Sequence, residues 1–335
     1  MSESLRICLD VGITQTRAWI LDGTEIVARA TRMQGIRGGT DDAIASIDAA
    51  IADCLRLNLH PNEVPVQYVA AAGMVTSELG PYSLAHLHGT SGMERLAESL
   101  DERTYVGCVR APLFLARGLR FGSPADFGDM DAMRGEETLF MGLLNRGLLR
   151  KGDALLNLGS HWKLIRSNTA GEITGSYTGI GGELALAISR ETILKAVLPE
   201  VRPVSVDMAS LQRGKTQSSE FGLARALFLL RMHSQRERVT SQDAYWYMIG
   251  AIIADALPLI TGQIAQSEAE TVAIAGYPAL TEAWSHCLSA HGIATRLLTE
   301  GDVEECFCAG LISIVEAHLH KEKVETKNGQ KSDDR

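Results

Sequence analysis

The sequence lacks the features typical of a nucleic-acid-binding, membrane or secreted protein. It has no excess of positive charge: 32 lysine and arginine residues stand against 41 aspartate and glutamate residues, with a net charge of −9 and a pI near 5.5. This balance argues against a general nucleic-acid binder. No run approaches the roughly 20 consecutive apolar residues of a transmembrane helix, and the N-terminal residues show no hydrophobic signal-peptide core. We therefore expect a cytoplasmic protein without nucleic-acid or membrane partners.

Two further absences narrow the chemistry. The six cysteines have no zinc-like spacing, which favours free thiols in a reducing compartment. No Gly-x-Gly-x-x-Gly motif follows the first apolar strand pattern, which disfavours a dinucleotide-binding dehydrogenase. The chain has 335 residues, 45% hydrophobic and 22% charged, which suits one large globular domain or two of ordinary size.

The stretch from Leu9 to Trp19 reads as the end of one strand, a tight turn and the start of another. Gly12 gives the backbone freedom for the turn, and Asp10 places a carboxylate at the strand end. The turn also carries side chains with hydrogen-bond donors, namely Thr14, Thr16 and Arg17. Amides, hydroxyls and a carboxylate suit a phosphate with a hydrated Mg²⁺. A hairpin with a polar tip, capped by Asp10, accounts for this loop alone equally well.

The same order of elements returns in the second half of the chain. Leu156-Asn157-Leu158-Gly159 parallels Leu9-Asp10-Val11-Gly12. Each strand end leads into a polar turn, a second strand, another turn, a third strand, and a glycine-rich loop before a helix. This internal duplication, with strands and helices alternating, predicts an α/β protein with mixed sheets.

Composition also predicts where the halves join and where order ends. Residues 121–131 are rich in glycine, proline and aspartate, which indicates a boundary or hinge. We therefore predict lobes at residues 1–128 and 129–320, with a helix from Met133 to Leu149 opening the second lobe. Residues 321–335 are charged and almost without apolar side chains, so we predict a disordered tail there.

Several motifs connect the chain to a known family. The most specific is Met133–Thr138, which reads MRGEET. Shorter matches follow in order along the chain: Asp10-x-Gly12 with Arg17-Ala18, Gly35-Ile36, Ala72-Gly73-Met74, Gly159-Ser160-His161 with Lys163, Gly182-Glu183-Leu184, and Leu227-Phe228 with Arg231. On these residues the chain resembles the 2-dehydro-3-deoxygalactonokinase family of the sugar kinase, Hsp70 and actin superfamily, over most of residues 5–315.

The resemblance implies an α/β fold of two RNase H-like domains, each with a β-meander, that clamp ATP in a cleft between two phosphate hairpins. It implies ATP-dependent phosphorylation of 2-keto-3-deoxygalactonate on its 6-hydroxyl, with ATP and Mg²⁺ as cofactors and a small keto-sugar acid as substrate. A homodimer is compatible with it.

The chain departs from the family pattern in its phosphate and substrate loops. The first loop has Ile13 where the family usually has a threonine, and Gly80-Pro81 stands in place of Gly-Trp. The family's Thr-His-Ser-Lys-Trp is here Ser160-His-Trp-Lys-Leu164, and its Thr-Gly-Glu-Leu begins instead with Gly181. These changes bear on which sugar acid is accepted.

The resemblance also implies roles for individual residues. Asp10 is expected to hold Mg²⁺, and Glu136 to act as the general base beside Arg134, with Asp131 and Glu137 as alternative bases. Residues expected to bind the nucleotide are Gly12, Thr14, Thr16, Gly159, Ser160, His161 and Gly276. Those expected to bind the substrate are Arg17, Gly35, Arg134 and Lys163, with Arg37 as a further cation.

Ordinary structural roles compete with these assignments. Glu136 and Glu137 could merely complement a helix dipole, and the glycines could serve only their turns. Two other functions also remain open at this point: a kinase for another small sugar or sugar acid, and a non-catalytic ATP- or sugar-binding regulator.

Overall fold

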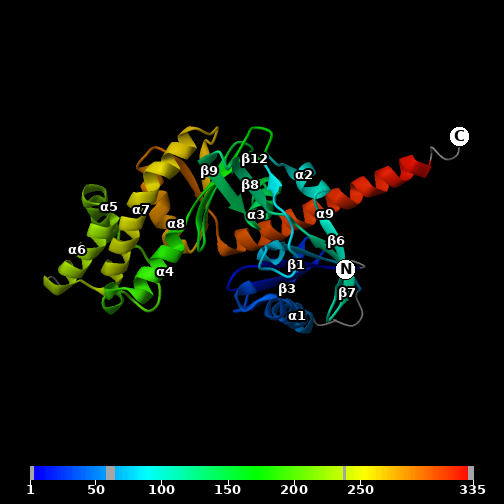
Figure 1. The fold of residues 1–335 in the computed structure, drawn as a ribbon, viewed down its shortest axis with the longest axis horizontal. Helices are drawn as coiled ribbons and strands as arrows, with labels where there is room; N and C mark the ends of the chain where they lie inside the picture. The colour runs from blue at the N-terminus through cyan, green and yellow to red at the C-terminus, as the bar shows by residue number, and fades with distance from the viewer. Residues whose placement is uncertain (1–3, 58–64, 237–238, 331–335) are drawn as a thin grey trace. The chain divides into compact units, whose positions relative to one another are not determined.

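The computed structural model describes residues 4–57, 65–236 and 239–330 (Figure 1). Two compact units make up the chain. Unit 1 comprises residues 1–150, 171–174 and 303–335, and unit 2 comprises residues 151–170 and 175–302.

Unit 1 is built on a six-stranded mixed sheet with the order β3-β2-β1-β4-β7-β6. Its strands are β1 (Leu5–Val11), β2 (Thr16–Asp22), β3 (Glu25–Arg32), β4 (Val66–Gly73), β6 (Asp101–Val106) and β7 (Arg110–Leu115). The first three strands pair antiparallel, whereas β4 runs parallel to β1 and β7 parallel to β4. Helix α1 (Thr40–Leu57) turns a face that includes Ile47 and Ile51 into the core beside this sheet.

A smaller sheet in unit 1 corrects one prediction. Its strands are β5 (Leu87–His88), β8 (Leu119–Ser123) and β9 (Asp126–Met133). The segment 121–131, predicted to be an irregular hinge, therefore forms most of the β8–β9 hairpin. Leu119, Phe121 and Met133 are buried along it, and the positive φ of Gly122 (75°) accompanies the register shift between Phe121 and Ser123. The glycine, proline and aspartate residues of this segment form a bulged hairpin and not a domain boundary.

Three helices complete unit 1: α2 (Met93–Glu98), α3 (Glu136–Asn145) and α9 (Glu300–Gln330). Helix α3 begins later than the predicted Met133, because β9 continues to that residue. Helices α3 and α9 approach closely through glycines. A Cβ atom on Gly142 would lie 1.7 Å from the carbonyl oxygen of Cys306, and one on Gly310 would lie 2.0 Å from that of Thr138.

Unit 2 repeats the plan of unit 1, which confirms the predicted duplication. Its sheet has the order β12-β11-β10-β13-β14, formed by β10 (Ala154–Leu158), β11 (Trp162–Ser167), β12 (Ile173–Gly179), β13 (Thr271–Gly276) and β14 (Ala294–Leu297). As in unit 1, a three-stranded meander is followed by two parallel strands. Helices α4 (Gly181–Glu191) and α8 (Pro278–Ser289) contribute buried side chains to the same core.

A group of three helices, α5 (Met208–Phe221), α6 (Leu223–Arg236) and α7 (Ser241–Ala265), lies together in unit 2 (Figure 1). Helices α5 and α7 touch through Gly214 and Gly250, whose added Cβ atoms would come within 2.0 Å of carbonyl oxygens. By length and composition, α7 could cross a membrane, contrary to the expectation from sequence, but half of its most apolar window is buried inside the structure. It belongs to the core of unit 2.

The two compact units differ from the lobes predicted at 1–128 and 129–320. The division falls between Arg150 and Lys151, and α9 returns to unit 1, where it packs on α3. The tail prediction is also corrected, because α9 continues to Gln330. His318 and Lys321 of α9 contact Ala97 and Glu98 of α2. Residues 331–335 lie outside the described part of the chain.

Candidate functional site

Asp10 lies near the end of β1, where β2, the end of β4 and the turn before α3 approach it. Its Oδ2 accepts a hydrogen bond of 3.2 Å from Nη1 of Arg17, which is its cross-strand partner on β2. An added Cβ on Gly73 would lie 3.1 Å from Oδ1 of Asp10, and one on Gly135 would lie 4.0 Å away. Both glycines have positive φ, 89° and 99°, so the chain passes Asp10 closely at places that disfavour a side chain.

The electrostatics of Asp10 fit a cation site. Burial is the largest influence and raises the pKa of Asp10, and the nearby Glu136 carboxylate raises it further, whereas Arg17 lowers it. Two carboxylates thus share a partly buried space with one guanidinium. A divalent cation placed there would relieve their repulsion, and oxygen ligands are those that Mg²⁺ prefers.

The MRGEET segment forms the turn from β9 into α3 and separates the two glutamates. Glu137 is fully buried, and both of its oxygens accept from the Gly135 amide, at 2.8 and 2.9 Å. Glu136 is only partly buried, accepts from the Arg134 amide at 3.0 Å, and interacts with Asp10. Glu137 therefore stabilises the turn, whereas the Glu136 carboxylate interacts with that of Asp10.

Arg134 is tied into unit 1. Its guanidinium donates to the Thr76 hydroxyl at 3.0 Å and to the Leu84 carbonyl at 2.8 Å, and it approaches Nδ1 of His86 at 3.3 Å. Burial lowers its pKa. These contacts fasten the MRGEET turn to the short helix η2 (Met74–Thr76), so Arg134 positions the turn.

Asp131, the alternative base, lies on β9 opposite Phe121. One carboxylate oxygen accepts from the adjacent Ala132 amide at 2.7 Å, and the other is buried without a hydrogen-bond partner among the described residues. The interactions that join Asp10, Arg17 and Glu136 in the described structure do not involve Asp131.

The first loop is braced by the short helix η1 (Ile36–Gly38). The amides of Ile36 and Arg37 donate to the carbonyls of Gly12 and Ile13, at 3.1 and 3.2 Å. Gly35 allows this contact, because an added Cβ would lie 2.2 Å from the Gly12 oxygen. Two predicted nucleotide ligands use their donors within the protein. The Gly12 amide donates to the Gln15 carbonyl, and the buried Thr16 hydroxyl donates to the Gln34 carbonyl. Thr14 is exposed at the tip.

The second loop, in unit 2, repeats this bracing. An added Cβ on Gly182 would lie 2.3 Å from the Gly159 oxygen, and the Glu183 amide donates to Ser160 at 2.9 Å. Gly159 and Ser160 are exposed, and His161 Nε2 lies 3.8 Å from a Glu183 oxygen. The structure buries Lys163, a predicted substrate ligand, at 4% exposure on β11.

Gly276 ends β13 as Gly73 ends β4. Its φ is 150°, and an added Cβ would lie 2.8 Å from that of Leu158, at the end of the neighbouring strand. The glycine lets the chain leave β13 close beside the strand that leads into the second loop.

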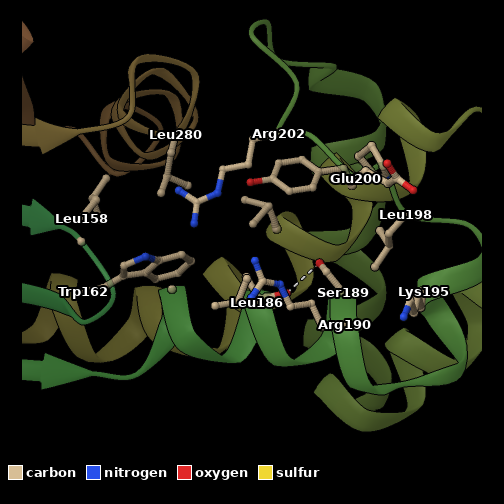
Figure 2. Close-up of a pocket in the computed structure, with 16 residues that line it drawn as sticks. Leu158, Trp162, Leu186, Ser189, Arg190, Lys195, Leu198, Glu200, Arg202 and Leu280 are labelled. Atoms are coloured by element: carbon tan, nitrogen blue, oxygen red, sulfur yellow. Dashed lines mark hydrogen bonds between the residues drawn. The ribbon is translucent and has the colours of Figure 1, made fainter. Parts of the chain in front are cut away.

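A cavity of about 420 Å³ adjoins the second loop within unit 2. It is lined by Gly159 and Gly182, by apolar side chains, and by the cationic side chains of Arg190, Lys195 and Arg202. Figure 2 shows Arg190 and Arg202 reaching into this space from opposite sides, with Leu158, Trp162 and Leu280 at one end. A pocket of apolar walls with a few charged groups is typical of a small-molecule site.

Arg202 also lies near two phenols. Its charge lowers the pKa values of Tyr245 and Tyr277, although burial outweighs it and leaves both raised. The Tyr277 hydroxyl is buried without a hydrogen-bond partner in the described structure.

Sequence reasoning missed the arginine and lysine side chains that line the cavity. It also missed the close approach of Gly73 to Asp10 and the hydrogen bond of Thr76 with Arg134. Gly73 had a signal, since it falls in a family motif. Arg190, Lys195 and Arg202 had none, because they are spaced along a helix end and an irregular segment and meet only in the folded unit.

The two units share one sheet plan, each with a braced loop after its first strand. This is the architecture expected of the sugar kinase and actin-like ATPase class, and the family match decides the class. The chain matches the family model of 2-keto-3-deoxy-galactonokinase over residues 10–314. It therefore belongs to that family, and it is a sugar-acid kinase, a phosphotransferase with an alcohol acceptor.

Solved structures agree with this fold. The chain is similar to a Sinorhizobium meliloti protein assigned as a 2-dehydro-3-deoxygalactonokinase, with a TM-score of 0.72, 20% identity, and coverage of 93% of this chain and 98% of that one. It is also similar to the activator of 2-hydroxyisocaproyl-CoA dehydratase from Clostridium difficile with bound ADPNP, with a TM-score of 0.53, 12% identity, and coverage of 95% and 97%. No curated protein matches the sequence.

Proposed function

We propose that this protein transfers the terminal phosphoryl group of ATP to the 6-hydroxyl of 2-dehydro-3-deoxy-D-galactonate, in cytoplasmic galactonate catabolism. The observation that carries the proposal is the convergence of Asp10, Arg17 and Glu136 at the end of β1, in a chain of this kinase family. Phosphoryl transfer needs a metal ion, charge neutralisation and a proton acceptor.

Mg²⁺ fits Asp10, which carries a raised pKa and faces a second carboxylate. The ion would neutralise charge on the phosphates. Asp10 would hold it, in part through water, because Mg²⁺ keeps several waters.

Glu136 serves as the general base for the acceptor hydroxyl. Its hydrogen bond from the Arg134 amide stabilises the carboxylate, and its partial exposure leaves it accessible to a substrate. Glu137 is a weaker candidate because both of its oxygens are occupied by the Gly135 amide.

Arg17 is the better candidate for the substrate carboxylate. Its side chain is 43% exposed beside Asp10, whereas the Arg134 guanidinium is directed to Thr76 and Leu84. Arg134 acts instead as a positioning residue for Glu136.

The nucleotide is assigned to unit 2. The exposed Gly159 and Ser160, with His161, offer donors to phosphates. The neighbouring cavity accepts the adenine and ribose, because its apolar walls and its arginines suit a flat heterocycle. The C. difficile relative, solved with ADPNP, supports a nucleotide site on this fold.

An ADP-release assay with 2-dehydro-3-deoxygalactonate, 2-dehydro-3-deoxygluconate, plain hexoses and glycerol tests the proposal. We expect turnover with the galactonate derivative above the others. Preference for a hexose would contradict the substrate assignment. ATP binding without turnover of any compound would favour a non-catalytic regulator.

A further inference from the structure

A second group of potential metal ligands lies in unit 1, away from Asp10. Glu102 of β6 meets His318 and Glu322 of α9, and one ligand atom from each lies within 4.8 Å of the others. In the sheet order, β4 and β7 separate β6 from the strand that carries Asp10. The family motifs and the proposed phosphoryl transfer use none of these three residues.

His318 is oriented as a metal-binding histidine is. Its Nδ1 lies 2.9 Å from the Ala97 carbonyl, and because a carbonyl only accepts, Nδ1 carries the proton. In the neutral imidazole the lone pair then sits on Nε2, as in histidine ligands whose second nitrogen donates to a backbone oxygen.

Within the described structure, the Nε2 atom of His318 makes no hydrogen bond but has a carboxylate beside it. It is buried without a hydrogen bond among the described residues, in a side chain only 14% exposed. An oxygen of Glu322 lies 3.6 Å away, so the two groups form an ion pair when His318 is protonated. When His318 is neutral, its lone pair and the carboxylate oxygen cannot hydrogen-bond to each other, but both can bind one cation. Buried polar atoms without partners are costly and call for a physical explanation.

The spacing and charge of the group fit a transition-metal ion. With metal–ligand distances near 2.1 Å, two ligands of a tetrahedral zinc site lie roughly 3.4 Å apart, close to the 3.6 Å between His318 and Glu322. Glu102 and Glu322 are exposed, so their side chains can turn inward. Two carboxylates balance the charge of a divalent cation, and the nitrogen ligand favours zinc over magnesium or calcium.

We propose that Glu102, His318 and Glu322 bind one divalent transition-metal ion of the zinc class, with water completing the coordination. The ion joins edge strand β6 to helix α9, next to the contacts of His318 and Lys321 with α2 (Figure 1). The site is structural, because it draws on no residue of the Asp10 cluster.

Calorimetric titration of the full-length protein with Zn²⁺ alone tests the site. The His318→Gln variant should lose one bound equivalent, and Glu322→Gln and Glu102→Gln should each weaken that equivalent by tenfold or more. His320→Gln is the matched control, since His320 is an exposed histidine two positions along the same helix, and it should bind Zn²⁺ as the unmodified protein does.

Titration with Co²⁺ provides a second readout. The visible absorption of tetrahedral Co²⁺ should appear in the unmodified protein and in His320→Gln, and should be lost in His318→Gln. The exposed position of Glu322 keeps the test informative if His318→Gln fails to fold. The proposal is overturned if the unmodified protein binds no Zn²⁺, or if the bound equivalent persists unchanged in Glu322→Gln and in a folded His318→Gln.

Discussion

At the scale of single residues, two adjacent glutamates with the same side chain have different environments. Glu137 is buried and receives the Gly135 amide with both oxygens. Glu136 is partly exposed and acts electrostatically on Asp10. This difference arises from the turn between β9 and α3. Glu137 therefore stabilises the turn, and Glu136 is the one proposed as the general base.

Replacing the proposed base should abolish most turnover while sparing nucleotide binding. Glu136→Gln keeps the size of the side chain but removes its capacity to accept a proton, so kcat should fall by about 10²- to 10⁴-fold. The measurement is steady-state ADP release with ATP affinity determined separately. Asp131→Asn is the matched control and should retain kcat within a few-fold. The opposite pattern would move the base to Asp131.

The raised pKa of Asp10 predicts a stability effect of defined sign. A carboxyl whose folded pKa lies above its ordinary 3.8 costs stability when ionised, so Asp10→Asn should unfold at a higher temperature than the unmodified protein at pH 7 without Mg²⁺. The difference should diminish as pH falls through the raised folded pKa and vanish below 3.8, where Asp10 is protonated in both states.

Mg²⁺ should reverse that order. A ligand that binds only the folded state raises the melting temperature, so Mg²⁺ should stabilise the unmodified protein and have little effect on Asp10→Asn. Thermal melts with and without Mg²⁺ at pH 7 make the comparison. Equal stabilisation of both proteins would place the metal away from Asp10.

At the scale of elements, glycines determine how closely segments approach. Gly35 and Gly182 seat the bracing segments on the two loops, and Gly142 and Gly310 bring α3 and α9 into backbone contact. A side chain at any of these positions would meet backbone atoms, which move less readily than side-chain tips.

Gly142→Ala should therefore destabilise unit 1. The new methyl would overlap the Cys306 carbonyl, and overpacking of this kind costs about 1–3 kcal/mol. Chemical denaturation is the measurement. Gly301→Ala is the control in α9, where the nearest atom would be at 3.8 Å, and it should unfold close to the unmodified protein. Equal stability of Gly142→Ala would show that α3 and α9 are not in this close contact.

At the scale of the whole molecule, the proposed function assigns different tasks to the two units. In this proposal, unit 1 would supply the metal and acceptor groups, and unit 2 would supply the nucleotide pocket. Variants in each should therefore alter the kinetics of one substrate more than the other.

Arg202→Ala should raise KM for ATP by about tenfold, a loss of roughly 1.4 kcal/mol, and leave KM for the sugar acid nearly unchanged. Arg17→Ala should show the reverse pattern. The control is Arg236→Ala, an exposed arginine of α6, which should alter neither constant. Effects of Arg202→Ala confined to the sugar acid would contradict the nucleotide assignment.

The sequence predicted much of this organisation. The period of apolar residues and the repeat of Leu9–Gly12 at Leu156–Gly159 predicted the duplicated meander, which pairs as expected. The MRGEET motif led to the family. Composition failed where a turn-rich segment, 121–131, became a paired hairpin, and where the charged residues 321–330 continued a helix.

The candidate site was less fully predictable. Asp10 and Arg17 lie opposite each other because of strand register, which the sequence implied. The burial of Lys163 and the inward-turned hydroxyl of Thr16 depend on tertiary packing. The convergence of Arg190 and Arg202 likewise requires the fold of unit 2.

The central claim is that this protein phosphorylates the 6-hydroxyl of 2-dehydro-3-deoxygalactonate. Phosphorus NMR of the purified protein with ATP, Mg²⁺ and this sugar acid tests it most directly, because coupling to the protons on C6 identifies the ester position. The account predicts a 6-phosphate that forms at the rate of ADP release and is nearly absent with Glu136→Gln. ADP release without a sugar phosphate, or a phosphate ester at another carbon, would contradict it.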